Sequence, residues 1–131
     1  MPERSPFGTW NGRESFEIHD GVHLHAIGGE QVLLCRVRYD PGKEVPWHVH
    51  EDTEQVMVIL DGEVEMTIEE ETRVLKAGDV VVVNRGQRHK LFSGPGVTFM
   101  EALAPVPLDH VPDRSLDLVL GPDGGSGHVE K

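Results

Sequence analysis

PGKEVPWHVH, residues 41–50 of this 131-residue chain, runs directly into EDTEQ at residues 51–55. In an extended strand successive side chains point to opposite faces, so His48 and His50 lie on the same side. Two imidazoles on one face, followed by carboxylate and amide oxygens, are typical of the beginning of a metal site. The segment therefore predicts a strand that ends in two metal ligands.

A second segment, GDVVVVNRGQRHKLFS at residues 78–93, completes the pattern. A glycine turn leads into a run of valines, a second glycine turn follows, and His89 opens the next strand. Together the two segments resemble the two motifs of the cupin superfamily, and the resemblance covers about residues 28–104. Asn84 and Ser93 stand where the family has proline and asparagine. The matching positions are Gly42, His48, His50, Gly62, Gly78, Gly86 and His89.

The resemblance implies a metal held by the three motif histidines and by a fourth side chain, which in the family is usually a carboxylate. Counting back from Gly62 places Gln55 at that position. Strand alternation also favours Gln55, because it shares a face with Met57 and Ile59, whereas Glu54 faces away. Glu54 remains the alternative fourth ligand, since the loop before the strand leaves its register open.

Short strands separated by glycine-rich turns at intervals of roughly eight to twelve residues predict an all-β antiparallel sandwich or barrel. This agrees with the jelly-roll architecture that the cupin resemblance implies. We expect a loose arm at residues 1–15 with Trp10 as its anchor, a barrel at 16–104, and a surface-packed, then frayed, tail at 105–131. Asp-Gly at residues 61–62 predicts a hairpin turn.

Two predicted strands, residues 55–60 and 80–83, are apolar on both faces. The interior of a small barrel covers only one face of each strand, so the outer face needs another cover. Trp47 and Val49 add to the apolar outer surface. These faces predict a homodimer, as is common in the family that the chain resembles.

A second histidine pair, His23 and His25, also shares one strand face. No carboxylate or amide cluster follows it along the chain. We therefore interpret these two residues as exposed or interface histidines and not as metal ligands.

The composition excludes several classes of partner. The formal charge of −11, from 23 acidic and 12 basic residues, opposes binding to nucleic acid or to anionic membranes. A single cysteine excludes an internal disulfide, and neither a secretion signal nor a long apolar span is evident. The expected location is therefore cytoplasmic.

Three imidazoles and an amide oxygen suit one divalent transition metal, whether Zn, Fe(II), Ni, Co or Mn. These neutral donors leave the charge of the ion uncompensated, which favours polarisation of a substrate carbonyl or enolate. The expected pocket is apolar and suits a small aromatic molecule; its lining residues are Met57, Ile59, Leu91 and Phe99.

The chain also resembles, loosely, small cupins of aromatic polyketide biosynthesis, some of which are cyclases. A cyclase or isomerase is therefore the favoured function for the sequence. The alternatives are a metal-dependent dioxygenase and a non-catalytic protein that binds a metal or small ligand. No catalytic residue beyond the metal ligands is identified from the sequence.

Overall fold

The computed structural model describes residues 7–12, 14–29 and 31–105, in which nine strands and no helix occur. The predicted tail, apart from Pro105, lies outside the described residues, as does part of the predicted arm. In the part of the chain that is described, no helix is long and apolar enough to cross a membrane. The strands are β1 (Phe16–His19), β2 (Val22–Gly28), β3 (Leu33–Tyr39), β4 (Lys43–His48), β5 (Glu54–Ile68), β6 (Glu71–Lys76), β7 (Val80–Val83), β8 (His89–Ser93) and β9 (Val97–Ala104).

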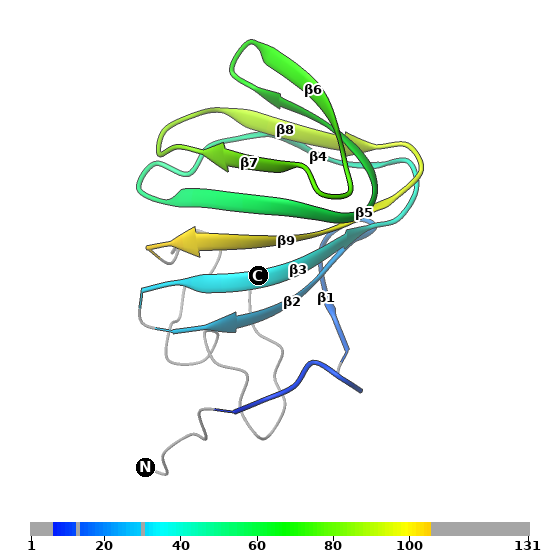
Figure 1. The fold of residues 1–131 in the computed structure, drawn as a ribbon, viewed down its shortest axis with the longest axis vertical. Helices are drawn as coiled ribbons and strands as arrows, with labels where there is room; N and C mark the ends of the chain where they lie inside the picture. The colour runs from blue at the N-terminus through cyan, green and yellow to red at the C-terminus, as the bar shows by residue number, and fades with distance from the viewer. Residues whose placement is uncertain (1–6, 13, 30, 106–131) are drawn as a thin grey trace.

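The strands form an antiparallel, nearly closed barrel, which confirms the predicted jelly-roll class. Their order is β1-β2-β3-β9-β5-β8-β4, and β6 and β7 each pair with β5. The first half of β5 pairs with β7 and β9, and its second half pairs with β6 and β8. β5 therefore passes from one sheet of the barrel to the other as a single strand of 15 residues, the curved green ribbon of Figure 1.

The hairpin predicted at Asp61-Gly62 is wrong, because β5 continues through these residues. Gly62 has a φ of 81°, and the pairing of β5 with β9 shifts register between Ile59 and Asp61. An Asp-Gly pair supplies the positive φ of a bulge as readily as that of a hairpin turn. Partner strands on both sides of the bend keep β5 extended, so the pair bends the strand instead of reversing it.

The core fills the interior of the barrel and follows strand alternation. Along β3, the inward side chains of Leu33, Cys35, Val37 and Tyr39 are buried, and the side chains between them are exposed. Cys35 is buried as a small apolar residue, and burial, together with the nearby Glu101, raises the pKa of its thiol well above the usual value.

Trp10 attaches the described part of the N-terminal arm to the outside of the barrel. Its Nε1 donates a hydrogen bond to the carbonyl oxygen of Ala26 at 3.2 Å. The guanidinium of Arg36 lies 5.4 Å from the Trp10 ring centroid, and the ring of His25 lies 6.0 Å away. The contacts cover part of the outer face of β2 and β3.

Candidate metal centre

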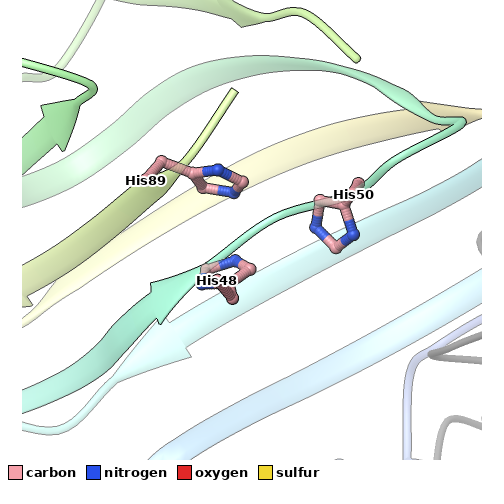
Figure 2. Close-up of side chains that lie close together, drawn as sticks. All are labelled: His48, His50 and His89. Carbon is pink, nitrogen blue, oxygen red and sulfur yellow. The ribbon is translucent and has the colours of Figure 1, made fainter. Parts of the chain in front are cut away.

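Three histidine side chains converge inside the barrel. His48 ends β4, His50 lies in the loop that follows, and His89 begins β8. One ring nitrogen of each histidine lies within 4.8 Å of those of the other two. Figure 2 shows the three rings close together, supplied by two neighbouring segments of the barrel. His50 and His89 are buried, and His48 is partly buried.

Backbone pairing brings the two histidine segments together. His48 and His89 are register partners in the β4–β8 pair. The N–H of Gly86, which has a φ of 79°, donates to the carbonyl oxygen of His50 at 2.9 Å. The loop after β4 is therefore joined to the glycine turn before β8. This contact explains why Gly86 precedes His89 by three residues in the second segment.

The backbone also selects the tautomer of two of the histidines. Nδ1 of His48 lies 2.8 Å from the carbonyl oxygen of Pro46, and Nδ1 of His89 lies 3.0 Å from that of Gln87. A carbonyl oxygen can only accept a hydrogen bond, so each Nδ1 carries the proton. In the neutral ring, Nε2 then keeps the lone pair with which imidazole binds metals.

The structure separates the two candidates for the fourth ligand. The side chain of Gln55 is buried, with 4% exposure, and lines the same cavity as His48 and His50. Glu54 is exposed on the other face of β5. The amide oxygen Oε1 of Gln55 is buried without a hydrogen-bond partner among the described residues, so it is available to an ion.

Glu101, on β9, is a carboxyl group of this site that the sequence analysis missed. Its Oε1 accepts a hydrogen bond from Nε2 of Gln55 at 2.5 Å. Burial raises the pKa of the Glu101 carboxyl to about 7, and the hydrogen bond from Gln55 opposes this shift. Alternation along β9 could have revealed it, because Glu101 shares the inward face with Phe99 and Leu103, which are buried.

The cavity beside these groups is small and mostly apolar, with a volume of about 50 Å³. Leu91 and Phe99 line it, as the sequence predicts. Met57 and Ile59 are also buried on the inner side of β5, but they lie in the core outside the set of residues that border the cavity. Its polar lining residues include His48, His50, Gln55 and Glu101.

The residues present fit a divalent transition metal. Three convergent imidazoles and a buried amide oxygen that lacks a hydrogen-bond partner in the described chain form a donor set of the kind such ions bind. A buried amide oxygen without a hydrogen-bond partner is costly, and a bound ion would satisfy the Oε1 of Gln55. His48, His50, His89 and Gln55 would hold the ion, and the donor set is compatible with several metals.

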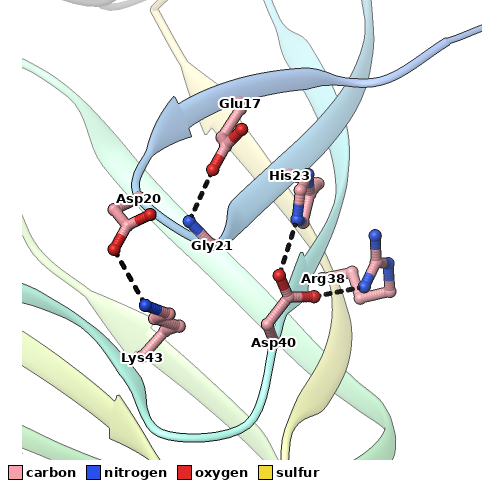
Figure 3. Close-up of polar contacts among 7 residues, drawn as sticks. All are labelled: Glu17, Asp20, Gly21, His23, Arg38, Asp40 and Lys43. Atoms are coloured by element: carbon pink, nitrogen blue, oxygen red, sulfur yellow. Dashed lines mark hydrogen bonds and ion pairs between the residues drawn. The ribbon is translucent and has the colours of Figure 1, made fainter.

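The second histidine pair lies elsewhere. Nε2 of His23 is 3.1 Å from Oδ2 of Asp40, whose Oδ1 accepts a 2.6 Å hydrogen bond from Arg38. Figure 3 shows this group next to a second ion pair between Lys43 and Asp20. The hydrogen bond with His23, followed by that with Arg38, lowers the pKa of Asp40. His23 therefore has a role in an ion-pair network at the end of β2 and β3.

Comparison with protein families agrees with this geometry. The family model described as "Cupin domain" matches residues 35–100, which include both histidine segments. The chain belongs to the cupin family. No protein of curated function matches its sequence.

Solved structures show how far the cupin fold extends along the chain. KdgF from Halomonas sp. is 20% identical with a TM-score of 0.74, covering 80% of this chain and 97% of its own. An RmlC-like cupin from Shewanella frigidimarina is 22% identical with a TM-score of 0.75, covering 85% and 100%. A predicted oxalate decarboxylase from Thermotoga maritima is 20% identical with a TM-score of 0.66, covering 75% and 97%. At these identities the likeness establishes a single cupin domain.

Proposed function

We propose that this cupin is a metal-dependent enzyme that activates a carbonyl group of a small apolar or aromatic substrate, polyketide-like in its chemistry, for cyclisation or isomerisation. The observation that carries the proposal is the buried amide of Gln55, which lines the same cavity as His48 and His50 and whose oxygen lacks a hydrogen-bond partner among the described residues. The ligand set then consists of neutral groups only. A bound ion would act as a Lewis acid on a carbonyl oxygen, with a charge that its ligands do not neutralise.

The protein's own groups support this use of the site. The Nδ1–H groups of His48 and His89 donate to backbone carbonyls, so both rings are held in one orientation and Nε2 is the nitrogen left for an ion. Leu91 and Phe99 offer apolar contact to a substrate, and they exclude water from the reacting group. The site therefore combines a polar end with an apolar wall.

The volume of the cavity limits how a substrate can bind. About 50 Å³ accommodates an ion and a few non-hydrogen atoms, whereas pockets that enclose a whole drug-sized ligand measure roughly 300–1,000 Å³. We infer that the carbonyl end of the substrate enters the cavity and that the rest of the molecule lies at its mouth.

The proposal is tested by reconstituting metal-stripped protein with Zn, Fe(II), Ni, Co or Mn and assaying aromatic β-dicarbonyl compounds under strict anaerobiosis. We expect turnover without oxygen, and NMR of the products should show cyclised or isomerised compounds of unchanged mass or with loss of water. Turnover that requires and consumes oxygen would instead establish a dioxygenase. Ligand binding without turnover for any metal would establish a binding protein.

We further propose that the chain acts as a homodimer that buries the outer face of β7, β5 and β9. Cross-strand register aligns Val82, Val56 and Ala102 in one row and Val80, Val58 and Met100 in the next. Val80 is 70% exposed and Val82 50% exposed. Two copies of a chain with a charge of −11 repel each other, so an uncharged, self-complementary patch is the surface best suited to pairing.

Trp47, which the sequence analysis also assigned to the outer apolar surface, is partly covered within the chain. The guanidinium of Arg88 lies 4.7 Å from its ring centroid, and Nζ of Lys90 lies 4.9 Å away. Contacts of this kind favour a tryptophan that stays at the surface beside cations. The proposed dimer contact therefore rests on the valine rows and not on Trp47.

A further inference from the structure

Gln55 and Glu101 are diagonal neighbours on the inner face of the β5–β9 pair. Gln55 is the register partner of Leu103, and Glu101 is the register partner of Met57. The two side chains therefore start two residues out of step on adjacent strands, a separation that long side chains bridge. They meet in the hydrogen bond from Nε2 of Gln55 to Oε1 of Glu101.

This hydrogen bond fixes the orientation of the Gln55 amide. Oε1 of Glu101 accepts the hydrogen bond from the NH₂ end of the amide, which is the only end of the amide that can donate. With the NH₂ end held by Glu101, Oε1 is turned away from it and is buried with no hydrogen-bond partner in the described chain. Rotating the amide by half a turn would bring two oxygens together.

Glu101 has no evident role in packing. Among the described residues that line the cavity, it carries the only carboxyl group. Its nearest residues in register are Met57 and Cys35, neither of which compensates a charge. Its Oε1 accepts the hydrogen bond from Gln55. A carboxyl group buried among apolar residues destabilises the fold unless hydrogen bonds or opposite charges compensate for its lost hydration.

We propose that Glu101 is a positioning residue that holds the Gln55 amide with its oxygen toward the metal centre. The carboxyl group of Glu101 would then lie behind Gln55 and contact the ion only through that side chain. The inference rests on the metal site of the proposed function, but not on the reaction assigned to it. A hydrogen bond from the amide to a carboxylate also shifts electron density toward Oε1, which makes that oxygen a stronger donor.

The inference predicts that the two side chains can be exchanged. In the variant Gln55→Glu/Glu101→Gln, the carboxylate would be the ligand and the amide at 101 would donate to it from behind. Composition, charge and the number of hydrogen bonds are retained. Each single change instead leaves two amides or two carboxyl groups together, and this removes the fixed orientation or adds repulsion.

The test measures binding of Co(II) to metal-stripped protein by calorimetry and by its visible absorption spectrum. We expect Glu101→Gln to weaken binding about 10- to 100-fold, and the exchange variant to restore affinity at least to the wild-type value. Glu65→Gln, at an exposed position of β5, is the control and should bind as wild type. Thermal melting of each metal-free variant verifies that it is folded.

Three outcomes would overturn the inference. Wild-type affinity and spectrum in Glu101→Gln would show that Glu101 does not position the ligand. Loss of affinity in both Glu101→Gln and the exchange variant, with Gln55→Ala binding normally, would make Glu101 itself the ligand. Absence of Co(II) binding in the wild-type protein would remove the metal site altogether. Normal metal binding without catalytic turnover would overturn the proposed reaction alone.

Discussion

His48 and His89 face each other as direct partners across the β4–β8 pair, and their ring centroids are 4.0 Å apart. Both therefore project from a hydrogen-bonded ladder and not from a free loop. Ladder positions hold side chains more precisely than loops do, so the two candidate ligands are pre-positioned. His50 lies in the loop beyond β4, which is joined to the second segment through Gly86.

Removing one of the paired histidines should empty the metal centre. We expect His48→Ala and His89→Ala to weaken Co(II) or Zn binding by more than about 100-fold, because the loss of a ligand exceeds the effect of losing a group behind it. Metal content after dialysis, measured by mass spectrometry of the element, tests this. His23→Ala is the control, since His23 pairs with Asp40 outside the centre. Loss of metal in this control but not in His89→Ala would contradict the ligand set.

Substitution of two neighbouring residues on β5 should affect metal binding differently. Gln55→Ala should weaken metal binding, because it removes a buried oxygen from the cavity. Glu54→Ala should leave binding unchanged, because Glu54 is exposed on the other face. Calorimetric titration of both metal-stripped variants makes the comparison. Loss of binding in Glu54→Ala alone would mean that β5 is shifted by one residue, and a dioxygenase-like carboxylate site would become the better interpretation.

The bend of β5 should depend on a glycine at position 62. A Cβ there would overlap the carbonyl oxygen of Gly96 and lie 2.9 Å from Cα of Val97. We expect Gly62→Ala to lower the free energy of unfolding by more than about 2 kcal/mol, through strain and displaced backbone. Gly78→Ala is the matched control: its φ of 93° is also positive, but a Cβ there meets nothing within 4 Å. Equal losses in urea denaturation would show that the contact with Gly96 has no cost.

A single charge in the valine rows should separate the proposed dimer. Val82→Glu would place two carboxylates near each other across the interface, and light scattering at micromolar concentration should then give the mass of a monomer. Val74→Glu is the matched control, because Val74 is 54% exposed on β6 and Val82 is 50% exposed on β7. A wild-type protein that is already monomeric would refute the dimer.

The ion-pair network at Asp40 should make stability depend on pH. Its hydrogen bonds with His23 and Arg38 lower the pKa of the Asp40 carboxyl in the folded state. The stabilisation is therefore present above the unfolded pKa of about 3.9 and is lost as the pH falls through the lower, folded value. Thermal melting should find Asp40→Asn less stable than wild type near pH 6, with the difference shrinking below about pH 4. A difference that grows with acid would contradict this assignment.

Much of the site was predictable, since it depends on local alternation. The spacing of His48 and His50, and the parity that separates Gln55 from Glu54, are properties of an extended chain and require no partner strand. His89 was predicted from a resemblance between motifs, because it reaches the other histidines only through the β4–β8 pairing. The sequence could not predict which atom of the Gln55 amide is available to an ion. The orientation of the amide depends on a hydrogen bond to Glu101, which lies on a different strand.

The course of β5 could not be predicted from its own residues. Asp61-Gly62 suits a hairpin and a bulge equally well, and the choice between them is made by β9 and β8, which pair with the strand before and after the bend. The size of the cavity could not be predicted from the sequence either. Met57 and Ile59 have inward parity but lie in the core, and only packing decides which inward side chains border the cavity.

The continuity of β5 links the unfolding of the two sheets. A strand that belongs to both sheets cannot detach from one without exposing unpaired backbone in the other, so the sheets should open together as one cooperative unit. Amide hydrogen exchange would then find one slowest class, spread over β9 and β8 alike. An ion bound through Gln55, near the start of β5, would slow exchange throughout the barrel and not only around the histidines.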